Sequence, residues 1–162
     1  MVSTEIKVGI ADLNLVLDPG AIMTIGLGSC IGIALYDKTL KVAGLAHIML
    51  PDSTQFKSST NPMKFADLAI PMLIEKMEGQ GCKKRNLIAK IAGGASMFNF
   101  SDKSIISDIG KRNGEAVKKS LKEVSIPILA EEIGGNKGRT MILQANDGKV
   151  ILKVVGLGII EL

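Results

Sequence analysis

Three residues whose side chains could together carry out a hydrolysis lie in the first third of the chain: Thr24, Cys30 and His47. A free cysteine is only a few per cent thiolate at neutral pH, and a histidine beside it raises that fraction by acting as its base. A threonine hydroxyl both donates and accepts hydrogen bonds, so it could fix the orientation of the imidazole ring. The three residue types indicate acyl transfer through a cysteine nucleophile.

The strands that would position these residues are short and are separated by glycines and polar turns. We expect a β-meander with strands at 21–25, 31–36 and 42–50. A turn centred on Leu27 would set Thr24 opposite Cys30, and a two-residue turn at 38–39 would set Cys30 opposite His47. Directly opposed residues share one face of a sheet with their Cβ atoms about 5 Å apart. This register predicts all three side chains on one face, and a slip of one residue would move His47 to the other face.

The environment of the candidate nucleophile allows two interpretations. In the catalytic one, backbone N–H groups at Gly26 and Gly28 stabilise an oxyanion, and Gly28 and Ser29 form part of a substrate or partner surface. A thiolate beside an imidazolium would also have a lowered pKa, and the pKa of His47 would be raised. In the simpler interpretation Cys30 is buried and inert, and His47 is only hydrogen-bonded. We expect Cys82 to be an exposed loop thiol without a base.

Length and composition exclude several classes of protein. The chain has 162 residues, which predicts a single domain over 1–162. Aromatic residues make up only 3% and the net charge is +4, which disfavours nucleic-acid binding through base stacking. One histidine and two cysteines are too few for a multi-histidine or thiolate-rich metal site, and they give no disulfide framework. We therefore expect neither a bound metal nor a nucleic-acid partner.

The N-terminal region predicts a cytoplasmic protein. Glu5, Lys7 and Asp12 interrupt the stretch where a signal peptide needs an unbroken apolar segment. The uncharged stretch 19–36 is long enough to approach a membrane span, but a proline and several glycines divide it into short β-rich runs. We interpret this stretch as buried sheet.

The remaining pattern predicts an α+β fold in which sheet packs on sheet and helices lie outside. A helix is expected to begin after Asn61 with apolar residues at four-residue spacing, and Pro71 is expected to kink it or end it early. A second amphipathic helix is expected over 109–124. Further strands are expected at 87–92, 126–133, 140–145 and 149–155, the last two as a hairpin around Asn146-Asp147-Gly148.

Five groups of segments, in order along the chain, resemble the CheD family of chemoreceptor glutamine deamidases. They include Gly26-Leu27-Gly28-Ser29-Cys30 and Ala46-His47-Ile48-Met49-Leu50-Pro51-Asp52, followed by segments at 90–98, 109–117 and 134–139. The resemblance implies hydrolysis of selected glutamine side chains to glutamate on the helical cytoplasmic domain of chemoreceptors, in chemotaxis adaptation. It also implies a catalytic role for Cys30, His47 and Thr24, a thioester intermediate and no cofactor.

The resemblance carries further expectations about fold and partners. It implies a layered sandwich of mixed sheets, similar to cytotoxic-necrotizing-factor-type cysteine hydrolases, and binding of a CheC-type phosphatase. We expect a monomer that meets the membrane only through the receptor. Phe98, one of the few aromatic residues, is a candidate anchor of the partner surface, and core packing is its alternative role.

Two other functions remain open at this point. The domain could be a binding module without catalysis that stimulates the phosphatase. A cysteine peptidase is the third possibility, and the lack of an extended-cleft half-domain and of a pro-segment disfavours it.

Overall fold

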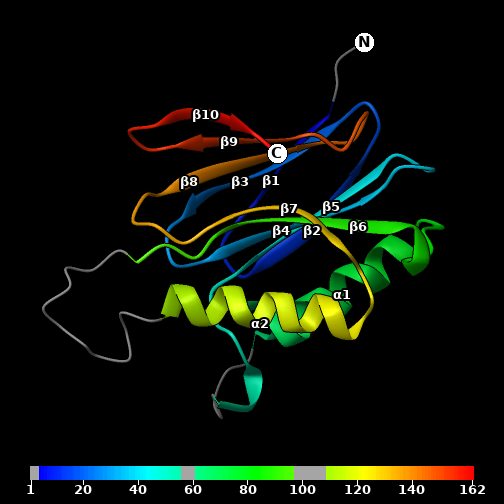
Figure 1. Cartoon of the computed structure of the whole chain (residues 1–162). Coiled ribbons are helices and arrows are strands. Elements are labelled where there is room, and N and C mark those ends of the chain that lie inside the picture. Colours follow the sequence, from blue (N-terminus) through cyan, green and yellow to red (C-terminus); the bar gives the residue numbers. More distant parts are fainter. Residues whose placement is uncertain (1–3, 56–60, 97–108) are drawn as a thin grey trace, which may run out of the picture.

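Two five-stranded sheets lie face to face, and two helices cover the outer face of one of them (Figure 1). The computed structural model describes residues 4–55, 61–96 and 109–162. Sheet A has the order β1 (Glu5–Val8), β3 (Ala21–Leu27), β8 (Arg139–Gln144), β9 (Val150–Val154) and β10 (Gly158–Glu161). Sheet B has the order β2 (Asp12–Leu17), β5 (Val42–Ile48), β4 (Ile31–Asp37), β6 (Leu87–Gly93) and β7 (Ile128–Ile133). Both sheets contain parallel and antiparallel pairs.

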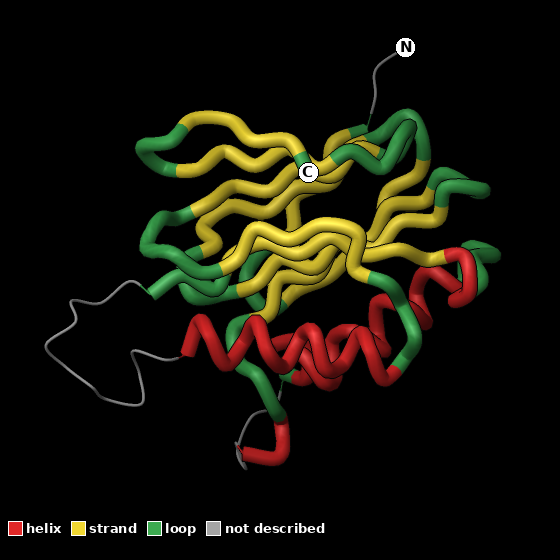
Figure 2. The backbone as a smooth tube through the Cα atoms, viewed as in Figure 1, coloured by secondary structure: helices red, strands yellow, loops and turns green. Residues whose placement is uncertain are grey.

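The α+β prediction with sheet packed on sheet is confirmed, and both helices lie on the same side. Helices α1 (Ala66–Glu78) and α2 (Ile109–Glu123) pack against sheet B alone, which gives the layer order sheet A, sheet B, helices (Figure 2). Helix α1 continues past Pro71 to Glu78, so the expected early end is not found.

Alternation along the two central strands of sheet B divides the core into two layers. Ile33 and Leu35 of β4 face the helices, whereas Ala34 and Tyr36 of the same strand face sheet A. Successive strand residues point to opposite faces, and both β4 and β5 are buried on both sides. A residue number in β4 or β5 is therefore enough to tell which layer its side chain enters.

The expected meander over 21–50 is wrong in its first half. Strand β3 does not pair with β4: it pairs with β1 and β8 in sheet A, while β4 pairs with β5 and β6 in sheet B. The chain crosses from one sheet to the other at Gly28–Cys30, so the turn is a corner of the sandwich.

The second hairpin exists, and its register differs from the predicted one by two residues. Asp37 pairs with Val42, which leaves a four-residue connection in place of the expected two-residue turn. The Asp37 carboxylate accepts hydrogen bonds from the backbone N–H groups of Thr39 and Leu40, and Lys41 adopts a positive φ of 55°. This side-chain-stabilised turn replaces the tight turn.

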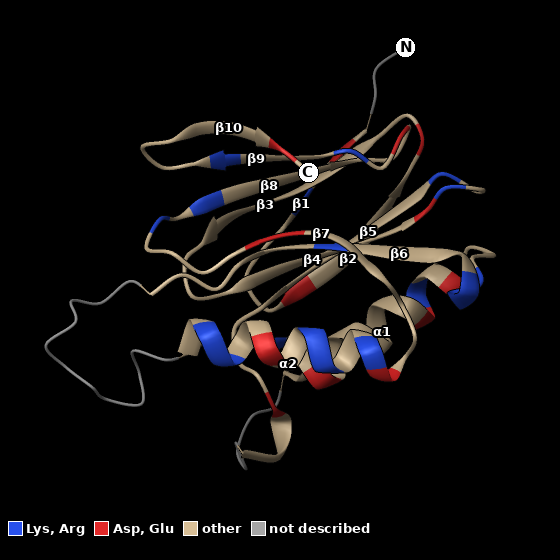
Figure 3. Ribbon diagram, in the orientation of Figure 1, with Lys and Arg blue, Asp and Glu red and all other residues tan. Residues whose placement is uncertain are grey.

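Most charged residues of α2 are exposed, and Figure 3 shows basic and acidic residues along the length of this helix. The basic residues alternate along the helix with glutamates, and Lys118 forms an ion pair with Glu131 of β7 at 2.8 Å. Among the described residues, no helix combines the length and apolar character needed to span a membrane.

Candidate active site

Thr24 and His47 meet between the two sheets. Thr24 lies on β3 of sheet A and His47 on β5 of sheet B, and the Thr24 Oγ1 to His47 Nδ1 distance is 2.7 Å. Both side chains are buried, with exposed fractions of 1% and 0%. Their hydrogen bond therefore spans the sandwich, and both sheets are needed to form it.

The hydrogen bonds of Thr24 fix the protonation of the imidazole ring. The Thr24 hydroxyl also lies 2.7 Å from the carbonyl oxygen of Val8, which can only accept a hydrogen bond. A hydroxyl has a single proton, so Thr24 donates it to Val8 and must accept a proton from His47 Nδ1. The neutral ring thus carries its proton on Nδ1, and Nε2 has a free lone pair. Nε2 is buried without a hydrogen-bond partner among the described residues.

Cys30 enters the same layer from the sandwich corner immediately before β4. Its side chain is partly buried and packs against the core between the sheets. Gly32, two residues further on, pairs directly with His47. The observed register differs by two residues from the predicted pairing of Cys30 with His47. Because side chains alternate between faces, a shift of two residues leaves Cys30 and His47 on the same face, as predicted. No Cys30–His47 hydrogen bond is formed, which is usual for catalytic pairs before substrate binds.

Gly32 lies beside Cys30 and His47, and the space next to it is occupied by side chains of sheet A. A Cβ at this position would lie 2.7 Å from Met141 Sδ and 3.1 Å from Leu27 Cδ1. Side chains of sheet A therefore fill the space beside the small residue.

Backbone contacts hold the corner in place. Gly94 N–H donates to the Cys30 carbonyl, and Ala95 N–H donates to the Gly28 carbonyl, both at 2.9 Å. The backbone of Gly93, at φ +119°, approaches so closely that a Cβ would lie 2.1 Å from the Cys30 oxygen. The end of β6 thus fixes the backbone of the candidate nucleophile.

Burial sets the charge state of the pair, and the outcome differs from the expected ion pair. Burial lowers the pKa of His47 to about 4. Burial also raises the pKa of the Cys30 thiol, and the residue's own backbone N–H lowers it by less. The resting pair is a neutral thiol and a neutral imidazole, because the dry layer between the sheets disfavours both charged forms.

The buried histidine makes the fold sensitive to acid. A folded-state pKa of about 4 against 6.5 in the unfolded chain means that the unfolded state binds the proton first. The stability from neutral His47 is complete above pH 6.5 and is lost as the pH falls to 4, about 3 kcal/mol in all. We expect His47→Gln to lose less stability than the wild type between pH 7 and pH 4.5, measured by urea unfolding. Equal losses in both proteins would contradict the assignment.

The structure changes the expectations for the Gly28 N–H and for Cys82. Gly28 N–H donates to the Gly26 carbonyl at 3.1 Å, so it is not free for an oxyanion. Ser29 is partly buried at the corner, and Phe98 lies outside the described residues. Cys82 is not an exposed thiol: it is 4% exposed, and burial together with the neighbouring Asp37 raises its pKa to about 11.

Sequence reasoning missed two residues that build this site. The carbonyl of Val8 accepts the hydrogen bond from the Thr24 hydroxyl. Val8 lies on an N-terminal strand that was not predicted, although apolar residues alternate at Ile6 and Val8. Arg139 is 5% exposed and donates to the carbonyls of Gly93 and Gly134, which binds the ends of β6 and β7 together. The sequence offered two signals for it: an arginine beside several glycines, and its place in the segment 134–139 that resembles the CheD family.

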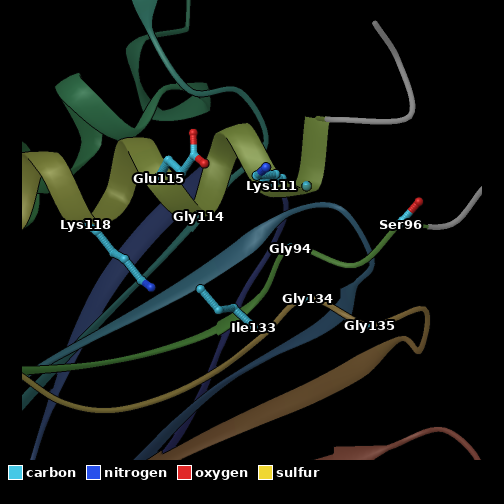
Figure 4. Close-up of a pocket in the computed structure, with 10 residues that line it drawn as sticks. Gly94, Ser96, Lys111, Gly114, Glu115, Lys118, Ile133, Gly134 and Gly135 are labelled. Carbon is cyan, nitrogen blue, oxygen red and sulfur yellow. The ribbon is translucent and has the colours of Figure 1, made fainter. Parts of the chain in front are cut away.

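A cavity of about 500 Å³ lies between the first turns of α2 and the glycine-rich ends of β6 and β7 (Figure 4). Gly94, Gly134 and Gly135 form its floor, and Lys111 and Lys118 stand at its rim. None of the three candidate catalytic residues lines it. One of its lining residues, Gly94, donates to the Cys30 carbonyl.

Comparison with known proteins identifies the family. The family model described as CheD chemotactic sensory transduction matches residues 49–154. Two proteins named probable chemoreceptor glutamine deamidase CheD, from Clostridium botulinum strains Alaska E43 and Eklund 17B, are 77% and 76% identical over the full length of both chains. A third, from strain Hall, is 69% identical over 98% of each chain.

One solved structure is also similar in part. The crystal structure of Bacillus licheniformis hypothetical protein YfiH matches 75% of this chain and 49% of its own, with a TM-score of 0.47 and 15% identity. The family match covers well over half of the chain, and the curated relatives cover it from end to end. The chain belongs to the CheD family.

Proposed function

We propose that the protein hydrolyses the side-chain amide of selected glutamines on bacterial chemoreceptors, giving glutamate and ammonia. The observation that carries the proposal is the Thr24–His47 contact, because it leaves Nε2 unprotonated in the layer that Cys30 enters. Full-length relatives carry the name chemoreceptor glutamine deamidase, which supports the same reaction here. Thr24 orients the ring, His47 moves the proton and Cys30 is the nucleophile.

The reaction proceeds in two acyl-transfer steps. Cys30 Sγ attacks the glutamine Cδ while its proton passes to His47 Nε2, and the tetrahedral intermediate collapses when His47 returns that proton to the departing amide nitrogen. Ammonia leaves and a thioester remains. A water molecule, deprotonated by Nε2, attacks the thioester, and the thiol leaves with the proton. The net change is hydrolysis of one amide bond.

Burial of His47 fits this sequence of steps. A base with a pKa of about 4 does not hold a proton at rest, so Nε2 is available at neutral pH. The imidazolium formed during attack faces the developing negative charge on substrate, and Thr24 Oγ1 still accepts the Nδ1 proton. Charge therefore forms only while the transition state is present to stabilise it.

We further infer the partners and relatives that the sequence indicates. The substrate is the helical cytoplasmic domain of a chemoreceptor, and a CheC-type phosphatase binds at a surface that includes Phe98. The protein is a cytoplasmic monomer, and its sandwich is related to cytotoxic-necrotizing-factor-type cysteine hydrolases. A binding module without catalysis would give phosphatase stimulation with no chemical change in the receptor.

The test is incubation of a chemoreceptor cytoplasmic fragment with the protein. We expect mass spectrometry to locate glutamines converted to glutamate and an equimolar release of ammonia. Protein whose Cys30 has been alkylated beforehand is the control and should release none. An unchanged receptor, together with normal binding of the phosphatase, would instead support the binding module.

A further inference from the structure

A buried asparagine joins the two segments that carry the nucleophile and its base. Asn113 lies on α2 at the apolar side that faces sheet B, and its exposed fraction is 0%. Its Nδ2 lies 3.0 Å from the carbonyl oxygen of Ser29 and 3.1 Å from that of Met49. Ser29 immediately precedes Cys30, and Met49 follows His47 by two residues. One amide group therefore bonds both sides of the candidate site.

The orientation of this amide follows from its partners. Both are backbone carbonyls, which only accept hydrogen bonds, so the NH₂ group must face them and the oxygen must point elsewhere. Both Nδ2 protons are used, and Oδ1 is buried without a partner among the described residues. A buried unpaired oxygen destabilises the folded state. If this position served only for packing, an aliphatic side chain would therefore give a more stable fold than asparagine.

Other contacts hold the two segments separately. Gly94 and Ala95, which directly follow β6, donate to the carbonyls of the corner at 28–30. The Lys64 carbonyl accepts from the N–H groups of Met49 and Leu50. Asn113 adds a direct link between the corner and the segment after β5, from a helix that belongs to neither sheet. The β4–β5 ladder, which pairs Gly32 with His47, already joins the two strands. Asn113 extends that link beyond the ladder, to Ser29 before Cys30 and to Met49 after His47.

We propose that Asn113 is a positioning residue that fixes the distance between Cys30 Sγ and His47 Nε2. The proposal rests on the proposed deamidation for its kinetic consequence. Because the thiol and imidazole are both neutral at rest, proton transfer depends on their separation, and a displacement of about 1 Å costs on the order of 100-fold in rate. Asn113 is fully buried and cannot itself contact the receptor, so we expect KM to change little.

The test uses Asn113→Leu, which keeps the number and branching of the side-chain heavy atoms and removes both donors. We expect kcat for ammonia release to fall on the order of 100-fold while KM stays within about twofold. The alkylation rate of Cys30 should fall toward that of His47→Ala. Val117→Ala is the matched control, since Val117 is buried on the same helix, one turn after Asn113, and its aliphatic side chain cannot donate to the carbonyls of the two segments. It should lower the melting temperature and leave kcat unchanged.

Asn113→Asp provides a second measurement if the leucine variant does not fold. An aspartic acid has the same shape, and it donates one hydrogen bond only when protonated. The deficit of this variant should shrink as the pH falls and its carboxyl group is protonated. Wild-type kcat and alkylation in either folded variant would overturn the proposal. Alkylation needs no receptor, so a wild type that releases no ammonia would refute the deamidation and leave the test of Asn113 valid.

Discussion

Cys30→Ser should reduce ammonia release from a receptor fragment to background, a loss of about 10³-fold or more. A serine hydroxyl is a far weaker acid than a thiol, and the imidazole that would deprotonate it has a pKa of only about 4. Proton transfer to such a base is therefore strongly uphill. The measurement is single-turnover ammonia release together with mass spectrometry of the receptor.

Cys82→Ser is the control for this experiment. Cys82 lies in the core between sheet B and the helices, where burial and the neighbouring Asp37 carboxylate raise its pKa to about 11 and so disfavour the thiolate. We expect this variant to keep its turnover, with any change confined to the melting temperature. Retained turnover in Cys30→Ser, or its loss in folded Cys82→Ser, would show that the nucleophile has been misassigned.

Gly93→Ala should abolish activity by moving the nucleophile. The new methyl carbon would lie 2.1 Å from the Cys30 carbonyl oxygen and 3.2 Å from Ile31 Cα, both backbone atoms that no side-chain rotation can relieve. A φ of +119° adds strain of about 1–3 kcal/mol for an L-residue. We expect loss of ammonia release and of Cys30 alkylation, and a melting temperature lowered by several degrees.

Gly134→Ala separates the two effects. Gly134 also has a positive φ, of +91°, but a Cβ there would have no heavy atom within 4 Å. Gly134→Ala therefore introduces backbone strain from the positive φ without a steric clash. We expect it to lose some stability and to retain Cys30 reactivity. If Gly93→Ala and Gly134→Ala lost the same amount of activity, the contact between β6 and Cys30 would have no role in positioning.

The sequence predicted the elements better than their pairing. Periodicity located both helices and most strands because it reports burial, and β4 and β5 are buried along their whole length. Pairing depends on turns, and the turn after Asp37 is set by its carboxylate rather than by chain length. Whether the chain at Gly28 folds back or crosses to a second sheet is decided by distant strands, which no local pattern reveals.

The sequence predicted which residues form the candidate site, but not their protonation states. Thr24, Cys30 and His47 do enter one layer, because an error of two residues in the register leaves the faces unchanged. The expected ion pair between a Cys30 thiolate and a His47 imidazolium assumed that both groups are exposed to water. The low pKa of His47 arises from enclosure between two sheets, and that enclosure requires β1 and β3 to lie in a sheet that the meander did not contain. The catalytic roles stay a prediction.

The division of sheet A between the two ends of the chain has a consequence for synthesis. Its strands come from 5–27 and 139–161, and Thr24 pairs with Met141 in the centre of the sheet. On the ribosome, sheet B can begin to pair while β3 still lacks the neighbour that holds it against β5. Elongation at about 5–20 residues per second leaves this gap open for several seconds. The reactive centre is therefore completed last, and a nascent chain cannot act on a receptor before its final strands have been made.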